Sequence, residues 1–367
     1  MAIKIGMVGM GGIGKTHSRV YQADPLAELV AVCDIVKEKA DAAAAEFGVK
    51  AYYSLTDMLA GEPDLDVVDV TTSGFENGSW HYEPAMQALR AGKNVFVEKP
   101  ISNDVREARE MVKYAADHDL YLACNLNHYF TQPADRAKEL IKEGKIGQPV
   151  YILHKMGFNG GDTKYGGIGS PRWQKPYSHT KAFLAHPFAV MRYFGGEITH
   201  VQCFMNRSGV RATAADPMYS IASIHCRFEN GSSGYLISQR GDSMFGLGGW
   251  WSFEMSGTKG TFVIENCVEK LYFWDATKDH ENNNEPEPDE VLDTGIKDFG
   301  TTFTNRLHAF LEDLTNQVPK EHLRSSGRDA LATLECTFAA IRSFEEGGAL
   351  VRVEPLPNLH GDPRYVW

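Results

Sequence analysis

Three features of the sequence combine residue types and spacings that can do chemistry: a glycine-rich turn, a lysine that ends an apolar run, and a histidine in a later helical pattern. They are Gly9-x-Gly11-x-x-Gly14, Lys99 and His186. A glycine turn that opens a helix can bind a phosphate, a lysine can stabilise a developing oxyanion, and a histidine can accept a proton.

The glycine turn directly follows the apolar run at 3–8 and opens a helical pattern, which is the context in which this spacing binds a dinucleotide. The first glycine makes the tight turn, the second lets the backbone approach a pyrophosphate, and the third lets helix and strand pack closely. Free N–H groups at the helix start then bind the anion. The cofactor contacts expected from this turn are Gly9, Gly11, Gly12, Ile13 and Gly14.

Asp34 ends the second apolar run, about 20 residues after the last glycine, where a carboxylate accepts hydrogen bonds from the adenosine ribose. Such a carboxylate repels a 2′-phosphate, and the neighbouring Ile35 offers no guanidinium to hold one. The pattern therefore predicts NAD in preference to NADP, provided that Lys37 is an ordinary exposed helix residue. The alternative for Asp34 is the N-cap of the next helix.

The stretch NVFVEKPIS at 94–102 is an apolar strand that ends in a carboxylate, an ammonium and a proline. A charged surface turn is the simple explanation. Ligands of a doubly wound sheet, however, bind beyond the carboxyl ends of its strands, so Glu98 and Lys99 are expected to face the cofactor. A cationic nicotinamide loosens the lysine proton, which suits proton transfer or alkoxide stabilisation. The bond between Lys99 and Pro100 is a candidate cis peptide.

The elements that position these groups form two series. Near-continuous apolar runs at 3–8, 28–33, 66–71, 94–97 and 120–124 alternate with helical patterns, which predicts a doubly wound parallel sheet. Later runs alternate between apolar and polar residues and are separated by turns, which predicts a mostly antiparallel open sheet. The expected fold is an α/β NAD-binding domain at 1–125, an α+β substrate-binding and oligomerisation domain at 126–352 that includes helices near 302–317 and 328–346, and a tail at 353–367.

Composition limits the class of protein. The chain of 367 residues is longer than one ordinary core needs, and 43% hydrophobic with 23% charged residues is globular. The formal charge of −11 argues against a nucleic-acid or anionic-membrane partner. Six scattered cysteines predict neither a disulfide framework nor a metal site. With no signal peptide and no apolar stretch of about 20 residues, we expect a cytoplasmic protein with a small-molecule substrate.

Several motifs together resemble those of the Gfo/Idh/MocA oxidoreductases, which include glucose–fructose oxidoreductase and inositol dehydrogenase. They are GMVGMGGIGKTHS, AVCDIV, DVVDVTTSG…HYEPAMQALRAGKNVFVEKPIS, NLNHYF and AKELIKEGKIGQPVYI, and the similarity covers nearly the whole chain. The resemblance implies NAD(P)-linked redox chemistry at a hydroxyl of a sugar, cyclitol or related polyol. It also implies a homo-oligomer, from dimer to hexamer, that forms through the open sheet.

The resemblance assigns roles position by position. Lys99 matches the lysine of the Glu-Lys-Pro motif, and His81 matches a histidine that opens a helix near the nicotinamide. Asn127 and His128 match the family's Asn-His pair, although Tyr129 stands where arginine is common. The remaining expected cofactor contacts are Thr72, Ser73, Glu98 and Asn127.

The largest departure from the family lies in KAFLAHPFAVMRYFGG at 181–196. The histidine of the family's Asp-x-Gly-x-His motif is His186, but Ala182 replaces the aspartate and Ala189 replaces a later one. The family's Lys–Asp–His trio is thereby reduced to Lys99 and His186, the expected catalytic residues. A histidine packed in the core is the alternative for His186.

A histidine base needs a partner that sets its tautomer. The candidates are His179, which is otherwise a plain loop residue, Asp162 and Tyr165. Trp173 and Tyr177 are candidates for a wall that stacks on a sugar or aglycone, or else for packing anchors. The run GLGGWW at 246–251 is expected to be exposed, and an oligomer interface is its favoured role. The expected substrate contacts are Lys99, His128, Asn159, Trp173, Tyr177, His179 and His186.

These expectations describe an NAD-dependent dehydrogenase of a sugar or glycoside. A long loop rich in glycine and aromatic residues and the missing aspartate favour a roomy pocket, hence oxidation at a ring carbon such as C3 of a glucoside. One alternative is glycoside cleavage in which bound NAD oxidises the sugar only transiently. Another is a non-catalytic sensor of NAD and sugar, which the loss of the carboxylate at Ala182 suggests and the retention of Lys99 and His186 opposes.

Overall fold

The computed structural model describes residues 2–73, 80–158, 175–207, 212, 217–240, 249–279 and 286–356. The chain divides into two compact units. Unit 1 comprises Met1–Leu126, Phe303–Leu334 and Pro355–Trp367, and unit 2 comprises Asn127–Thr302 and Glu335–Glu354.

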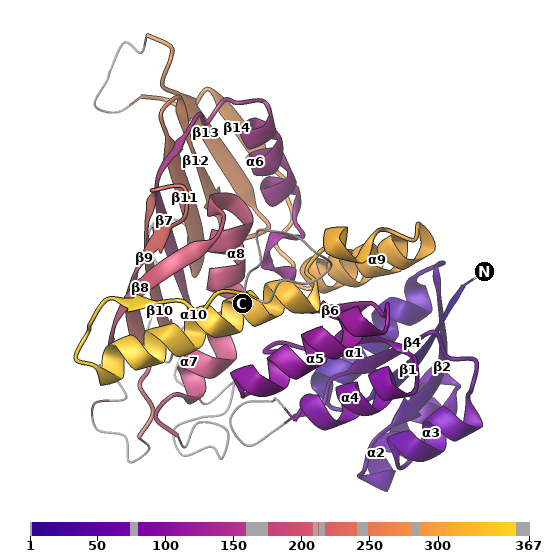
Figure 1. Cartoon of the computed structure of the whole chain (residues 1–367). Helices are drawn as coiled ribbons and strands as arrows, with labels where there is room; N and C mark the ends of the chain where they lie inside the picture. Colours follow the sequence, from indigo (N-terminus) through magenta and orange to yellow (C-terminus); the bar gives the residue numbers. More distant parts are fainter. Residues whose placement is uncertain are drawn as a thin grey trace. The chain divides into compact units, whose positions relative to one another are not determined.

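A parallel sheet forms the centre of unit 1 (Figure 1). Within the described residues it has six strands in the order β3-β2-β1-β4-β5-β6, and every neighbouring pair is parallel. This is the order of the dinucleotide-binding doubly wound fold, so the predicted class is confirmed. The strands are β1 Ile3–Val8, β2 Ala27–Cys33, β3 Lys50–Tyr52, β4 Val67–Val70, β5 Asn94–Val97 and β6 Leu122–Cys124. The sequence analysis missed β3, because three residues at a sheet edge leave no apolar run to recognise.

Helices connect these strands, as right-handed crossovers between parallel strands require. Their bounds are α1 Gly12–Ala23, α2 Lys37–Phe47, α3 Leu55–Gly61, α4 Tyr82–Arg90 and α5 Val105–Asp117. Two longer helices, α9 Thr301–Thr315 and α10 Gly327–Glu345, begin in one unit and end in the other, and the short 3-10 helix Lys320–His322 lies between them.

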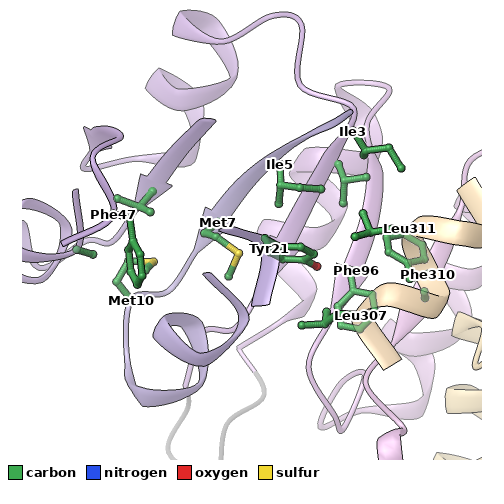
Figure 2. Close-up of a cluster of buried hydrophobic side chains, with 14 of the residues drawn as sticks. Ile3, Ile5, Met7, Met10, Tyr21, Phe47, Phe96, Leu307, Phe310 and Leu311 are labelled. Carbon is green, nitrogen blue, oxygen red and sulfur yellow. The ribbon is translucent and has the colours of Figure 1, made fainter. Parts of the chain in front are cut away.

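The hydrophobic core of unit 1 includes side chains from α9. Leu307, Phe310 and Leu311 of this helix are fully buried and pack in one cluster with Ile5 of β1 and Phe96 of β5 (Figure 2). Burying each such side chain contributes about 1.5–3 kcal/mol. The sequence analysis placed this helix in the second domain instead. The mismatch arises because an amphipathic pattern does not reveal which sheet the apolar face of a helix covers.

An open sheet forms the centre of unit 2. Among the described residues it has nine strands in the order β14-β13-β12-β11-β7-β10-β9-β8-β15, and only the pair of β7 and β10 is parallel. The mostly antiparallel sheet is therefore confirmed. The strands are β7 Pro149–Phe158, β8 Ile198–Asn206, β9 Ile221–Phe228, β10 Ser233–Arg240, β11 Trp251–Gly257, β12 Gly260–Glu265, β13 Lys270–Asp275, β14 Glu290–Asp293 and β15 Val351–Arg352.

Helices cover one face of this sheet (Figure 1). The other face carries partly exposed apolar side chains. The helices are the 3-10 turn Asn127–Tyr129, α6 Gln132–Lys142, α7 Ser178–Phe183 and α8 Ala185–Gly195. Tyr151, Leu153 and Phe204 expose 37%, 44% and 55% of their surface. In the ranges that the structure describes, no helix is long and apolar enough to cross a bilayer.

Candidate active site

The glycine turn is built as its spacing predicts. Gly9 has φ of +95°, and a Cβ there would lie 2.8 Å from the backbone of Thr71, which directly follows the neighbouring strand β4. A Cβ on Gly14 would collide with the carbonyl oxygen of Gly9. Thr71 also donates a hydrogen bond from Oγ1 to that carbonyl, at 2.6 Å. Only glycine at these two positions allows the turn and the close approach of α1.

The same turn leaves space where a pyrophosphate would bind. Apart from the adjacent residues and the backbone of α1 itself, no described atom lies within 4 Å of the Cβ positions built on Gly11 and Gly12. Gly11 is the N-cap of α1 and has no side chain to occupy the N–H groups of the first helical turn. These N–H groups and the positive end of the helix are suited to an anion, so the residues present fit a dinucleotide.

Asp34 stands at the end of β2 and braces the glycine turn. Its Oδ2 accepts a hydrogen bond from the N–H of Met10 at 2.8 Å, and its Oδ1 accepts one from the N–H of Val36 at 2.9 Å. The N-cap of α2 is Val36, so the alternative that Asp34 caps this helix is wrong. The neighbouring Ile35 is 85% exposed, and Ile13 in the turn is 42% exposed. Their contacts with a cofactor stay predictions.

The turn after β5 carries Lys99 at the carboxyl edge of the sheet. The Lys99–Pro100 peptide is cis, as the sequence suggested. Glu98 is buried, with Oε2 accepting the N–H of Lys99 at 3.0 Å and Oε1 accepting the side-chain amide of Asn125. These contacts hold the carboxylate of Glu98 inside unit 1, and its expected contact with a cofactor stays a prediction.

A buried histidine that the sequence analysis did not single out completes this turn. The Nδ1 of His17 lies 2.9 Å from Oδ2 of Asp69, and its Nε2 lies 3.2 Å from Oε1 of Glu98. Burial alone lowers the pKa of His17, but Asp69 and then Glu98 raise it to about 10, so the ring is protonated. Tyr21 donates a hydrogen bond to Asp69 at 2.8 Å. The sequence signal that could have revealed this cluster is Asp69, an aspartate inside the otherwise apolar strand VVDV.

His81 braces the other side of the Lys-Pro turn. It is 1% exposed, and its Nδ1 lies 2.7 Å from the carbonyl oxygen of Pro100, which can only accept a hydrogen bond. Burial lowers the pKa of His81, so the neutral ring carries its proton on Nδ1. Thr72 donates to the carbonyl of Trp80 at 2.6 Å, and Ser73 is exposed. The proposed cofactor contacts of these residues stay predictions.

In unit 2 the two predicted histidines of the site lie together. The rings of His128 and His186 stack with their centroids 3.7 Å apart and an angle of 13° between planes. Nε1 of Trp251 donates a hydrogen bond to Nδ1 of His128 at 3.2 Å. An indole nitrogen is only a donor, so Nδ1 of His128 is the acceptor and is unprotonated, and the ring carries its proton on Nε2. Asn127 is buried and donates to Thr302 at 2.7 Å.

The surroundings of this stack differ from those that the sequence analysis expected. The Nε2 of His179 lies 3.1 Å from Oγ of Ser238, and burial, followed by the charge of Arg240, lowers the pKa of His179 to about 3. The ring that stacks on His186 is that of His128, which the sequence analysis did not consider among the candidate partners of His186. Tyr177 donates to Glu345 at 2.8 Å and stacks on Tyr219, which favours its alternative role as a packing anchor.

The position of the missing aspartate is apolar. Ala182 is 1% exposed and clusters with Phe183 and Met218.

Trp251 is also 1% exposed, so the expectation that the whole run at 246–251 is exposed is wrong. The predicted residues that lie outside the described ranges are Asn159, Asp162, Tyr165 and Trp173. Among the residues described, no group of three or more histidine, cysteine or acidic side chains could hold a metal ion.

Comparison with known proteins gives consistent matches over most of the chain. Residues 3–126 match the family model of the Gfo/Idh/MocA oxidoreductases described as an NAD-binding Rossmann fold, and residues 134–263 match the model of a Gfo/Idh/MocA C-terminal domain. Levoglucosan dehydrogenase of Pseudarthrobacter phenanthrenivorans is 26% identical over 71% of this chain and 73% of its own length. Inositol 2-dehydrogenase of Rhizobium meliloti is 24% identical over 94% and 98%.

A solved structure shares the fold. Levoglucosan dehydrogenase in complex with NADH and levoglucosan superposes with a TM-score of 0.81 at 20% sequence identity, over 96% of this chain and all of that one (100%). At this identity the likeness establishes the arrangement of the backbone and not the substrate.

Proposed function

Because the chain belongs to the Gfo/Idh/MocA family and is an NAD-binding oxidoreductase, we propose that it oxidises a ring hydroxyl of a sugar or related polyol. NAD, when bound, supplies the acceptor for the hydride. The observation that carries the proposal is the position of Lys99, which follows β5 at the same edge of the sheet as the glycine turn after β1. Ligands of this fold bind at that edge.

In this proposal two side chains act on the substrate. His186 takes the proton of the hydroxyl while the hydride leaves the same carbon, so that a carbonyl forms. Lys99 donates a hydrogen bond to the oxygen and stabilises its developing negative charge. The stack with His128, whose tautomer Trp251 sets, supports this role for His186 because it holds the ring in one orientation.

We propose a sugar or glycoside as the substrate, with C3 of a glucoside as the site of oxidation. Two relatives are named for cyclic polyols, levoglucosan and inositol, which supports the class. The apolar surroundings of Ala182 support a pocket that differs from those with a carboxylate at this position.

The test is the absorbance of NADH when the purified protein meets NAD and a panel of free sugars, glycosides and inositols. A rise with glucosides and formation of a 3-keto product would support the proposal. A flat trace with release of aglycone would replace it with transient oxidation during glycoside cleavage. Binding of a sugar without turnover of any compound would replace it with a sensor.

We also propose that the chain forms a homo-oligomer through the exposed face of the open sheet. Tyr151 and Leu153 of β7 lie on this face and line a hollow of about 530 Å³ together with Tyr235 of β10. Phe204 of β8 is 55% exposed. Light scattering should give a multiple of the chain mass that falls in Leu153→Asp, and a monomer in the unsubstituted protein would contradict the proposal.

A further inference from the structure

We infer that His17 is a positioning residue for Lys99: it holds the carboxylate of Glu98, and Glu98 holds the backbone that presents the lysine. This inference rests on the proposed function, because that function assigns the reaction to Lys99. None of the contacts involved leaves unit 1.

The geometry forms one continuous chain of contacts. Oδ2 of Asp69 at the end of β4, the ring of His17, and Oε1 of Glu98 after β5 are linked at 2.9 Å and 3.2 Å. The second oxygen of Glu98 accepts the N–H of Lys99 at 3.0 Å. Asp69 and His17 are fully buried, so water cannot replace either contact.

The charges in this cluster favour one arrangement. A protonated imidazole between two carboxylates leaves one negative charge, which the ammonium of Lys99 can balance. Burial acts to raise the pKa of Glu98, but His17 and then Lys99 hold it below its usual range. Other titratable or charged groups facing this cluster lie on α1, before α4, on β6 and on α9; they are Tyr21, His81, Cys124 and Arg306.

The position of His17 on α1 gives the cluster a second consequence. The same helix begins with the glycines of the proposed cofactor site and carries His17 on its buried face. A histidine that served only to pair with Asp69 would need no contact with Glu98. The contact with Glu98 ties the helix that holds the cofactor to the turn that holds Lys99.

The experiment compares His17→Gln and Glu98→Gln with a control, Leu311→Ala, which weakens the core of the same unit without removing a charged or hydrogen-bonding group. The measurements are thermal midpoint, NAD affinity by calorimetry, kcat and KM, and the pH at which Lys99 is half modified in reductive methylation, with Lys99→Arg assigning the signal. We expect both cluster variants to lose about 10²-fold in kcat, with NAD affinity nearly unchanged. We also expect the pH of half modification to fall in Glu98→Gln, because a neighbouring negative charge is removed.

A purely structural role predicts a different result. The inference is overturned if His17→Gln and Leu311→Ala lower the thermal midpoint by the same amount and also have the same kcat and the same pH of half modification of Lys99. If His17→Gln does not fold, the test relies on Glu98→Gln. An unchanged pH of half modification of Lys99 in Glu98→Gln would overturn the inference. Lys99→Met separates the two proposals, since full turnover in that variant removes the proposed catalytic role of Lys99 while the modification result for Glu98→Gln still stands.

Discussion

His17 in unit 1 and His128 in unit 2 are both buried, and each is linked to a residue of the proposed reaction, His17 to Lys99 through Glu98 and His128 directly to His186, yet these contacts differ in charge. His17 contacts the carboxylates of Asp69 and Glu98. His128 contacts the ring of His186, the indole N–H of Trp251 and the ring of Phe299. Two carboxylates hold the first ring as a cation, whereas Nδ1 of the second ring accepts a hydrogen bond and is therefore unprotonated.

The difference teaches what burial alone does to a histidine. Two other buried histidines of unit 2, His154 and His179, have pKa values lowered to about 4 and about 3, in each case mainly by burial. His17 is buried as deeply, and only its two carboxylates reverse the direction. In unit 1 a charged histidine therefore joins two carboxylates, whereas in unit 2 burial favours the neutral form of His154 and His179.

The largest expected effect comes from removing the reacting group proposed in each unit. Lys99→Ala and His186→Ala should each lower kcat by about 10²-fold or more, because each removes a positioned acid–base group. The measurement is steady-state formation of NADH. Lys93→Ala, at the opposite end of β5, is the control and should keep full turnover. Loss in one variant alone would confine the chemistry to one unit and break the comparison.

The protonated ring of His17 between its two carboxylates predicts a loss of stability in alkali. The pKa of His17 is raised from 6.5 to about 10, so its contribution is complete below pH 6.5 and is lost as the pH rises through about 10. We expect the free energy of unfolding to fall between about pH 7 and about pH 9.5, and to fall less in His17→Gln. Denaturant midpoints at the two pH values measure this. Parallel curves for the two proteins would show that the ring is not a cation.

The neutral histidines predict a loss of stability in acid. The pKa of His179 is lowered to about 3, so below pH 6.5 the unfolded chain binds a proton that the folded ring does not. The thermal midpoint should fall as the pH decreases from 6.5, and it should fall less in His179→Asn. His322→Asn, at an exposed position, is the control and should follow the unsubstituted protein.

The smallest expected effect contrasts a buried ion pair with an exposed one. Lys113 and Asp117 form an i,i+4 pair at 2.6 Å, with side chains 61% and 51% exposed. Lys113→Ala should change the free energy of unfolding by no more than about 0.5 kcal/mol, because water and salt screen the pair. Denaturant unfolding at low and high salt measures this change. A loss as large as that of His17→Gln would mean that burial does not distinguish the two sites.

Local chemistry explains which features could be predicted from sequence. The glycine turn, Asp34 and Lys99 each depend on the conformation of a few adjacent residues and on the end of one strand. Alternating patterns likewise revealed the two kinds of sheet. The sequence analysis missed β3, because a three-residue edge strand has too little pattern.

The family and the class of each sheet followed from the sequence alone, because they depend on local spacing, and the same spacing led to the proposed cofactor-binding and catalytic residues. Only the tertiary structure decided that Glu98 turns inward to His17, that His128 stacks on His186, and that α9 packs in the core of unit 1. Each of these pairs residues far apart in the chain. Whether a buried histidine is charged or neutral follows from such partners, and no local pattern contains them.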